Sequence, residues 1–317
     1  MHGEFELISR WLAPKSPHNE ADVILGVGDD ACLVQPNPGK RLAISVDTSV
    51  QGRHFPGDAP AAAVGHRALA VSLSDLAAMG ARARWCLMSL SLPEADGDWV
   101  AEFARGFHAL CAETGVSLVG GDVTGGECAI SVTVMGEVDP AACLRRDGAK
   151  AGDVLAVTGS LGGGAGGLKA WQQGQRCLDD PLLARYLLPQ PRLAAGHGLA
   201  GLASAAIDIS DGLLADLDHL VTASGLGAEL DVKALPLAEG LVARLGQSAA
   251  RDAALGGGDD YELLVALAPG RVSQAQALLA EQGLALTVIG HLVEGAGIDG
   301  ADLPSQVGWQ HFSGGNA

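Results

Sequence analysis

Short apolar segments followed directly by glycine or aspartate recur along the whole chain, and longer amphipathic segments separate them. Short segments of this kind are typical of buried strands, and the longer ones are typical of helices. The expected strands are Val23–Val27, Leu42–Val46, Cys86–Leu92, Val116–Gly120, Ala129–Val138, Asp153–Thr158, Ala205–Ile209, Ala228–Val232, Tyr261–Ala266 and Leu286–Gly290. The expected helices are Ala61–Gly80, Asp98–Thr114, Asp211–Ala223, Leu237–Leu245 and Val272–Glu281. Their alternation predicts a mixed α/β (α+β) fold.

The length of the chain bounds the number of its domains. With 317 residues, of which 48% are hydrophobic, it can form one large domain or two ordinary ones. The polar segment Arg145–Gly152 carries two glycines and is the candidate junction. We therefore expect domains at about 1–148 and 149–317.

Charge and hydropathy exclude several classes of partner. The formal net charge of −17 makes nucleic acid and anionic membranes poor partners. The longest apolar stretch, Ala68–Ala81, is interrupted by Ser72, Ser74 and Asp75, so no membrane span is expected. The segment Met1–Leu12 lacks the features of a signal peptide, which favours a cytoplasmic location. The six cysteines lack zinc-site or redox-motif spacing and are expected to be reduced and mostly buried thiols.

Aspartates that follow the expected strands carry the main chemical signal. Glycine or another small residue lies beside most of them, and the set is Asp29, Asp30, Asp47, Asp122, Asp208, Asp211, Asp259 and Asp260. Ligands of α/β proteins bind at strand ends, and glycine lets the backbone approach them closely. Any one of these aspartates could instead cap a helix or begin a turn. If they converge, their charges need cations, and Mg²⁺ accepts carboxylates together with substrate phosphates.

Asp75 lies on the same face of an expected helix as Val64, Ala68 and Val71. A carboxylate within an apolar stripe is costly unless it is paired or bound to metal. This favours a ligand role for Asp75, and the alternative is that this face meets solvent near the helix end.

The sequence contains no phosphate-binding loop of the Gly-x-x-x-x-Gly-Lys-Ser/Thr type. The glycine-rich run Gly159–Gly167 follows a strand and could hold a phosphate with its backbone amides. A flexible linker or a close helix–strand contact explains the run equally well. His54 follows Asp47 by seven residues and could contact an anionic substrate group, although a surface histidine is the commoner outcome.

Several motifs, taken in order, resemble one enzyme family. They are Gly26–Ala31, Ser45–Thr48, Ser72–Gly80, Gly120–Thr124 and Ile207–Leu213. In this order and spacing the chain is similar, from about Gly3 to Phe312, to the thiamine-monophosphate kinase family. That family belongs to the aminoimidazole ribonucleotide synthetase-like ATP-binding superfamily. The resemblance implies two domains, each a mixed sheet flanked by helices, and a homodimer. It assigns ATP binding, magnesium binding and dimerisation to 1–148, and a contribution to nucleotide and substrate binding to 149–317.

The resemblance also implies an activity and a set of site residues. The activity is ATP-dependent phosphorylation of thiamine monophosphate to thiamine diphosphate, with Mg²⁺ as cofactor. The implied magnesium ligands are Asp30, Ser45, Val46 through its backbone, Asp47, Asp75, Asp122, Asp208 and Asp211. The implied ATP contacts are Gly121, Asp122, Arg146 and Ser210, and the implied thiamine contacts are His54, Asp259 and Trp309. Asp75, Asp122, Arg146 and Asp211 would carry the phosphoryl transfer.

The chain departs from the family pattern in three places. The family commonly reads Gly-Gly-Glu-Asp-Tyr-Glu where this chain reads Gly257-Gly258-Asp259-Asp260-Tyr261-Glu262, so the Asp259 side chain is one methylene shorter. The segment Gly162–Gly167 is richer in glycine than usual, and the C-terminal aromatic residue, here Trp309, varies in type.

The implied acceptor is a phosphate monoester, whose second pKa of ~6 leaves it largely deprotonated at neutral pH. No general base is then needed, and direct in-line transfer depends on positioning and charge neutralisation. The alternatives are another ATP-dependent enzyme of the superfamily, of the purine cyclo-ligase type, and a catalytically silent nucleotide-binding regulator. Selenophosphate synthetase is disfavoured because no cysteine precedes Cys32, and the intact aspartate motifs argue against a silent regulator.

Overall fold

The computed structural model describes residues 4–13, 22–301, 303 and 308. The chain forms two compact units, the first made of residues 1–76 and 81–141 and the second of residues 77–80 and 142–317. None of the helices in the described part of the chain is both long enough and apolar enough to cross a bilayer.

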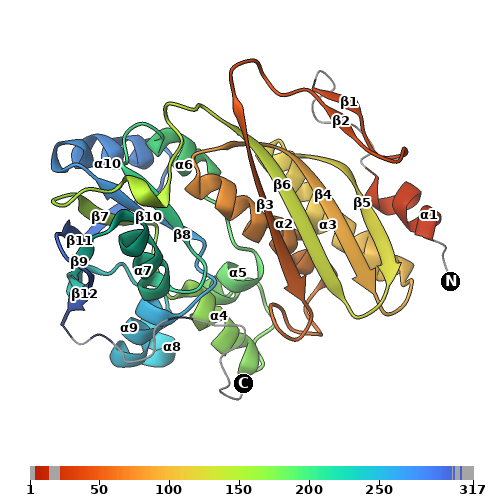
Figure 1. The fold of residues 1–317 in the computed structure, drawn as a ribbon. Coiled ribbons are helices and arrows are strands. Elements are labelled where there is room, and N and C mark those ends of the chain that lie inside the picture. The colour runs from red at the N-terminus through yellow and green to blue at the C-terminus, as the bar shows by residue number, and fades with distance from the viewer. Residues whose placement is uncertain (1–3, 14–21, 302, 304–307, 309–317) are drawn as a thin grey trace. The chain divides into compact units, whose positions relative to one another are not determined.

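The first unit is built on a four-stranded mixed sheet (Figure 1). Its strands, in spatial order, are β3 (Arg41–Val50), β6 (Ala129–Val138), β4 (Arg82–Leu92) and β5 (Ser117–Gly125). Only β4 and β5 run parallel, and the other neighbours are antiparallel. The helices α2 (Ala61–Ala78) and α3 (Gly97–Thr114) lie on one face of this sheet. The strand β3 is an edge strand, because β6 is its only neighbour among the described strands of the sheet.

Local sequence explains where α3 begins and ends. The Asp96 carboxylate accepts hydrogen bonds from the backbone amides of Asp98 and Trp99, which is a helix N-cap. Gly115 ends the helix at a φ of 70°, a conformation that glycine adopts without steric cost. Phe103 of α3, Leu73 of α2 and other fully buried residues form the core against the sheet.

Smaller elements lie beyond the β5 edge of this sheet (Figure 1). They are α1 (Glu4–Leu7), the single-turn helix η1 (Ile8–Leu12), and the two-stranded antiparallel pair β1 (Val23–Leu25) and β2 (Leu33–Val34).

The second unit is built on a six-stranded mixed sheet. Its strands, in spatial order, are β12 (Gly297–Gly300), β9 (Gly227–Leu230), β11 (Leu286–Val293), β7 (Val154–Thr158), β10 (Glu262–Leu267) and β8 (Ala205–Ile209). Its longer helices are α4 (Gly163–Gln172), α5 (Pro181–Leu187), α6 (Leu193–Leu199), α7 (Leu213–Ser224), α8 (Leu241–Leu245), α9 (Gln247–Gly256) and α10 (Val272–Glu281). Single 3₁₀ turns are η2 (Arg146–Gly148), η3 (Val232–Ala234) and η4 (Pro269–Arg271).

Both faces of this sheet are buried, and β10 shows why its sequence is continuously apolar after Glu262. Leu264 and Ala266 pack into a core that includes residues of α7 and α9. Leu263 and Val265 pack into a second core that includes residues of α6 and α10. A strand that is covered on both faces needs apolar side chains at every position.

The predicted mixed α/β class is confirmed, and each unit contains a mixed sheet flanked by helices. Ala129–Val138, Ala205–Ile209 and Val272–Glu281 have the predicted bounds. The predicted helix over Leu237–Leu245 begins only at Leu241, because Leu237 forms a β-bridge with Leu161.

The helices α5, α6 and α9 and the strands β2 and β12 were not predicted. The helix α4 begins inside the glycine-rich run, at Gly163. Glycine disfavours helices in isolation, but here the packing requires it. A Cβ at Gly167 would lie 2.2 Å from the Leu182 carbonyl oxygen, so α4 and α5 approach closely only because this side chain is absent.

Candidate active site

In the first unit, residues of the motifs Gly26–Ala31 and Gly120–Thr124 line a cavity of about 750 Å³. Asp30 reaches it from the loop after β1, and Gly121 and Asp122 reach it from β5. Leu12 and Leu118 add apolar surface to the same cavity. A Cβ at Gly121 would lie 1.9 Å from the Met88 carbonyl oxygen, so only glycine lets β5 lie this close to β4. Asp30 and Asp122 are distant in sequence and share one cavity.

The second aspartate motif lies on β3, where side chains alternate between two faces. The Ser45 hydroxyl donates a hydrogen bond to the Asp75 carboxylate of α2, so this polar position faces the helix. Asp75 is half-buried, whereas Val64, Ala68 and Val71 on the same helix face are buried. The Val46 side chain points to the opposite face and is 58% exposed. Val46 could therefore act as a metal ligand only through its backbone.

His54 lies in the turn after β3 and is half-buried. Its Nδ1 accepts a hydrogen bond from the Val50 amide at 2.9 Å. The Arg67 guanidinium donates to the His54 carbonyl oxygen at 3.1 Å, which fixes the turn from α2. Because Nδ1 is an acceptor, a neutral His54 carries its proton on Nε2.

In the second unit, the motif after β8 is held by a residue that sequence reasoning missed. The Asp216 carboxylate of α7 accepts hydrogen bonds from the amides of Ser210, Asp211 and Gly212 at 3.0, 3.1 and 3.2 Å. Burial raises the pKa of Asp216 to about 7, and the charges of Asp208 and Asp211 add to this rise. The available signal was an acidic residue in the first turn of a helix, where the helix dipole favours it.

Arg146 lies in the 3₁₀ turn η2 and is exposed. Its carbonyl oxygen accepts a hydrogen bond from the Ser224 hydroxyl at 2.7 Å, which ties this turn to the end of α7. Asp259 lies between α9 and β10 and is half-buried. Its amide donates to the Ser210 carbonyl oxygen at 2.8 Å, so Asp259 and Ser210 are neighbours in the backbone. Trp309 lies outside the described residues.

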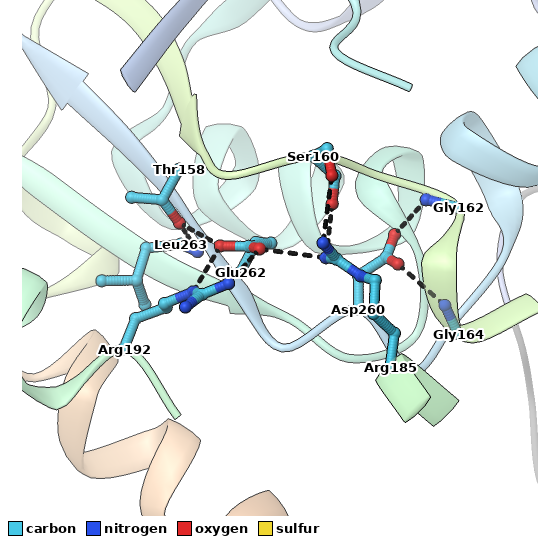
Figure 2. A network of polar contacts seen from close by, with 9 residues as sticks. All are labelled: Thr158, Ser160, Gly162, Gly164, Arg185, Arg192, Asp260, Glu262 and Leu263. Carbon is cyan, nitrogen blue, oxygen red and sulfur yellow. Dashed lines mark hydrogen bonds and ion pairs between the residues drawn. The ribbon is translucent and has the colours of Figure 1, made fainter. Parts of the chain in front are cut away.

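The glycine-rich run is occupied by a carboxylate of the chain itself, as Figure 2 shows. Asp260 accepts hydrogen bonds from the amides of Gly162 and Gly164 at 2.7 and 3.2 Å. Burial raises the pKa of Asp260 to about 7, although the two amides and Arg185 oppose this rise. The flexible-linker explanation is wrong, because Gly163, Gly164, Gly166 and Gly167 are buried in α4. The close-contact explanation is correct.

Glu262 is the centre of a second buried contact network beneath this loop (Figure 2). Its side chain is 0% exposed and accepts from the Thr158 hydroxyl at 2.7 Å. Arg185 donates to it at 3.0 Å, and Arg192 donates through two nitrogens at 2.7 and 2.6 Å. Arg185 also donates to the hydroxyl and carbonyl oxygens of Ser160. No local sequence pattern predicts these partners, because they are distant in the chain.

The candidate ligands suit magnesium chemically. Within the described ranges, no group of three or more His, Cys, Asp or Glu side chains is arranged to hold a metal ion by itself. Mg²⁺ usually binds one or two carboxylates and takes its other ligands from water and substrate phosphates. The half-buried Asp75 beside the Ser45 hydroxyl, and Asp30 with Asp122 in one cavity, offer oxygen donors of this kind.

Comparison with known proteins assigns the family. Residues 28–138 match the domain family of the AIR synthase related protein N-terminal domain. Residues 150–302 match the corresponding C-terminal domain family. Thiamine-monophosphate kinase from Salmonella typhimurium is 38% identical over 317 residues, which cover 98% of this chain and 97% of that protein.

Two solved structures agree with this assignment. The crystal structure of thiamine-monophosphate kinase from Stenotrophomonas maltophilia K279a has a TM-score of 0.86 at 43% identity, covering 94% of this chain and 95% of that one. AaThiL complexed with AMPPCP and TMP has a TM-score of 0.79 at 32% identity, covering 88% of this chain and 89% of that one. The chain belongs to the thiamine-monophosphate kinase family of AIR synthase related proteins.

Proposed function

We propose that this chain transfers the terminal phosphoryl group of ATP to the phosphate of thiamine monophosphate and so forms thiamine diphosphate. The observation that carries the proposal is the 38% identity to a thiamine-monophosphate kinase over almost the full length of both chains. AaThiL, another relative, was solved with TMP and the ATP analogue AMPPCP. A cytoplasmic location is part of the same proposal, since the reaction consumes ATP.

The first unit is proposed to bind the magnesium-bound nucleotide. The 750 Å³ cavity supports this, because it combines the carboxylates of Asp30 and Asp122 with backbone at Gly121. Ser45, the Val46 backbone, Asp47 and Asp75 are proposed further magnesium ligands. The assignment of roles to 1–148 and 149–317 remains part of this proposal.

The second unit is proposed to contribute Asp208 and Asp211 to magnesium, and Arg146 and Ser210 to ATP. The three hydrogen bonds to Asp216 support this, because they fix the backbone of the Ser210–Gly212 turn before any ligand binds. The exposed Arg146 supplies a cation in a chain of strongly negative charge. Asp259, with His54 and Trp309, is proposed to contact the thiamine substrate.

The chemistry needs no proton-abstracting residue, because the acceptor is a phosphate oxygen that is largely deprotonated at neutral pH. The residues of the chain align the two anionic substrates and hold them in line. When bound, Mg²⁺ would neutralise the charge that develops on the transferred phosphoryl group. We propose direct transfer without a phosphoenzyme.

A homodimer is also proposed, formed through the open face of the first sheet. Leu42, Ile44 and Val46 of the edge strand β3 are 42, 61 and 58% exposed. They occupy every second position of the strand and therefore lie on the same face of the sheet. Ser45 between them faces α2, so the three apolar side chains lie on the face opposite that helix. A row of exposed apolar residues on an edge strand favours association, and a second copy offers the same self-complementary row.

Ile44→Lys is therefore expected to convert the dimer to a monomer, because it places a charge within the apolar row. Sedimentation velocity measures the mass of both proteins. Val288→Lys is the matched control, since Val288 is an exposed strand residue of the second unit, on β11, and its substitution should leave the mass unchanged. An Ile44→Lys protein that keeps the dimer mass, or a wild-type monomer, would contradict the proposed interface.

The activity is tested by incubating the purified protein with ATP, magnesium and thiamine monophosphate and measuring thiamine diphosphate by chromatography. Product is expected, and it should disappear when EDTA removes magnesium. ATP binding without product would retain nucleotide binding and discard thiamine monophosphate as the acceptor. A purine cyclo-ligase or a regulator would then be tested next.

A further inference from the structure

The segment between α9 and β10 has an unusual backbone. Asp259 and Tyr261 have φ angles of 68° and 50°, and in the described part of the chain they are the non-glycine residues with positive φ. Asp tolerates this conformation better than most residues, whereas a bulky tyrosine is a rare occupant of it. Such strained positions persist only where the surroundings determine them, and they often occur at functional sites.

Hydrogen bonds on both sides hold this segment in place. The Asp259 and Tyr261 amides donate to the carbonyl oxygens of Ser210 and Ile209, each at 2.8 Å. Asp260, between them, sends its carboxylate to the Gly162 and Gly164 amides (Figure 2). The strained backbone is thus tied both to the end of β8 and to the start of α4.

Gly164 shows how closely this segment is fitted. A Cβ at Gly164 would lie 2.4 Å from the Asp259 carbonyl oxygen, so any side chain there would displace the segment. The position of the Asp259 backbone is therefore fixed, and the remaining freedom of its carboxylate lies in the side-chain torsions.

A hydrogen bond from Tyr261 restricts those torsions. The phenolic hydroxyl donates to the Asp259 Oδ1 at 2.9 Å, and the Tyr261 side chain is only 8% exposed. Asp259 itself is half-buried, and this hydrogen bond holds one oxygen of its carboxylate. The two positive φ angles bring the side chains of residues two apart in sequence into contact.

We propose that Tyr261 is a positioning residue that orients the Asp259 carboxylate toward the cationic ring of thiamine monophosphate. This inference rests on the proposed role of Asp259 in substrate binding. A neutral phenol suits the task, because it donates a hydrogen bond without contributing a positive charge that would offset the charge of the carboxylate. The shorter aspartate needs a fixed direction, because it reaches one methylene less far than the glutamate common in the family.

Tyr261→Phe tests the inference, because it removes only the hydroxyl. The KM for thiamine monophosphate is expected to rise about tenfold, as is typical for losing a hydrogen bond to a charged group. The KM for ATP, kcat and the thermal unfolding midpoint should stay close to wild type. This split identifies positioning of the substrate contact, since a general structural defect would move all four quantities. Tyr186→Phe changes the other tyrosine of the chain and should leave both KM values unchanged.

A double-mutant cycle separates positioning of Asp259 from an independent role. In an Asp259→Asn background, Tyr261→Phe is expected to have little further effect, because without the negative charge at residue 259 the hydroxyl has no substrate ion pair left to orient. An equal rise in both backgrounds would overturn the inference, and so would a wild-type KM in Tyr261→Phe.

Calorimetric titration of thiamine monophosphate, in the presence of magnesium and a non-hydrolysable ATP analogue, distinguishes failure of the inference from failure of the proposed function. If the wild type binds but makes no product, the cycle is run on Kd and still decides the role of Tyr261. If the wild type neither binds nor reacts, the proposed function and the inference resting on it both fail. If the wild type makes product but Tyr261→Phe has the same effect with and without Asp259→Asn, the inference fails and the proposed function stands.

Discussion

Glu262→Gln is expected to lower the free energy of unfolding by about 3 kcal/mol, at the lower end of the range for breaking a buried ion pair. The fully buried carboxylate is the shared acceptor of Arg185 and Arg192. Glutamine keeps its size but leaves two guanidinium charges without their counter-charge and turns an amide donor toward one of them. The lower end applies because the arginine side chains are 28 and 24% exposed, so solvent screens part of their charge.

Urea denaturation measures this change as a shift of the midpoint at constant slope. The matched control is Glu229→Gln, which removes a carboxylate that is 56% exposed and lies 3.3 Å from His291. An exposed pair contributes little, so a change below about 0.5 kcal/mol is expected there. Equal midpoints for the two variants would show that the buried network does not stabilise the second unit as argued.

Asp75→Asn is expected to reduce kcat/KM for thiamine diphosphate formation by about a thousandfold, a loss typical of removing one electrostatic group from an active site. Asparagine has nearly the same shape, and its oxygen can still accept from the Ser45 hydroxyl, so the fold should be retained. The lost property is the negative charge that the proposed magnesium ligand provides. The magnesium concentration that gives half-maximal activity should also rise in this variant.

The control for this prediction is Asp218→Asn, which neutralises an exposed aspartate on α7. Its rate should stay within twofold of wild type, and circular dichroism should show both variants folded. Near-wild-type activity in a folded Asp75→Asn protein would remove Asp75 from the set of catalytic residues. An unfolded Asp75→Asn protein would show instead that the carboxylate is needed for stability.

Much of the candidate site follows from local sequence. The aspartate motifs could be found because strand ends, glycine neighbours and period-two or helical spacing are properties of short segments. Asp75 could be placed on a buried helix face for the same reason. Asp216 lay within reach of the same reasoning, since it is an acidic residue in a first helical turn.

The role of the glycine-rich run Gly159–Gly167 could not be decided from local sequence. Its composition was compatible with a phosphate-binding loop, a flexible linker or a close helix–strand contact. These three differ in which group packs against the glycines, and that group is distant in the sequence. Asp260 lies opposite, 98 and 96 residues away from the two amides that it binds. The positive φ angles of Asp259 and Tyr261 were likewise hidden, because intrinsic propensity disfavours them and tertiary contacts impose them.

The sequence by itself determined the mixed α/β class, the order of most strands and helices, and the aspartate–glycine motifs, because hydrophobic periodicity and turn chemistry act over a few residues. The predicted place of three aspartates was wrong: Asp47, Asp122 and Asp208 lie inside β3, β5 and β8 and not after a strand. Only the tertiary structure decided that Asp260 occupies the start of α4, that Glu262 pairs with two arginines, and that Tyr261 holds Asp259. These contacts depend on burial and on partners brought together by the sheet, and a buried carboxylate is stable only with such partners.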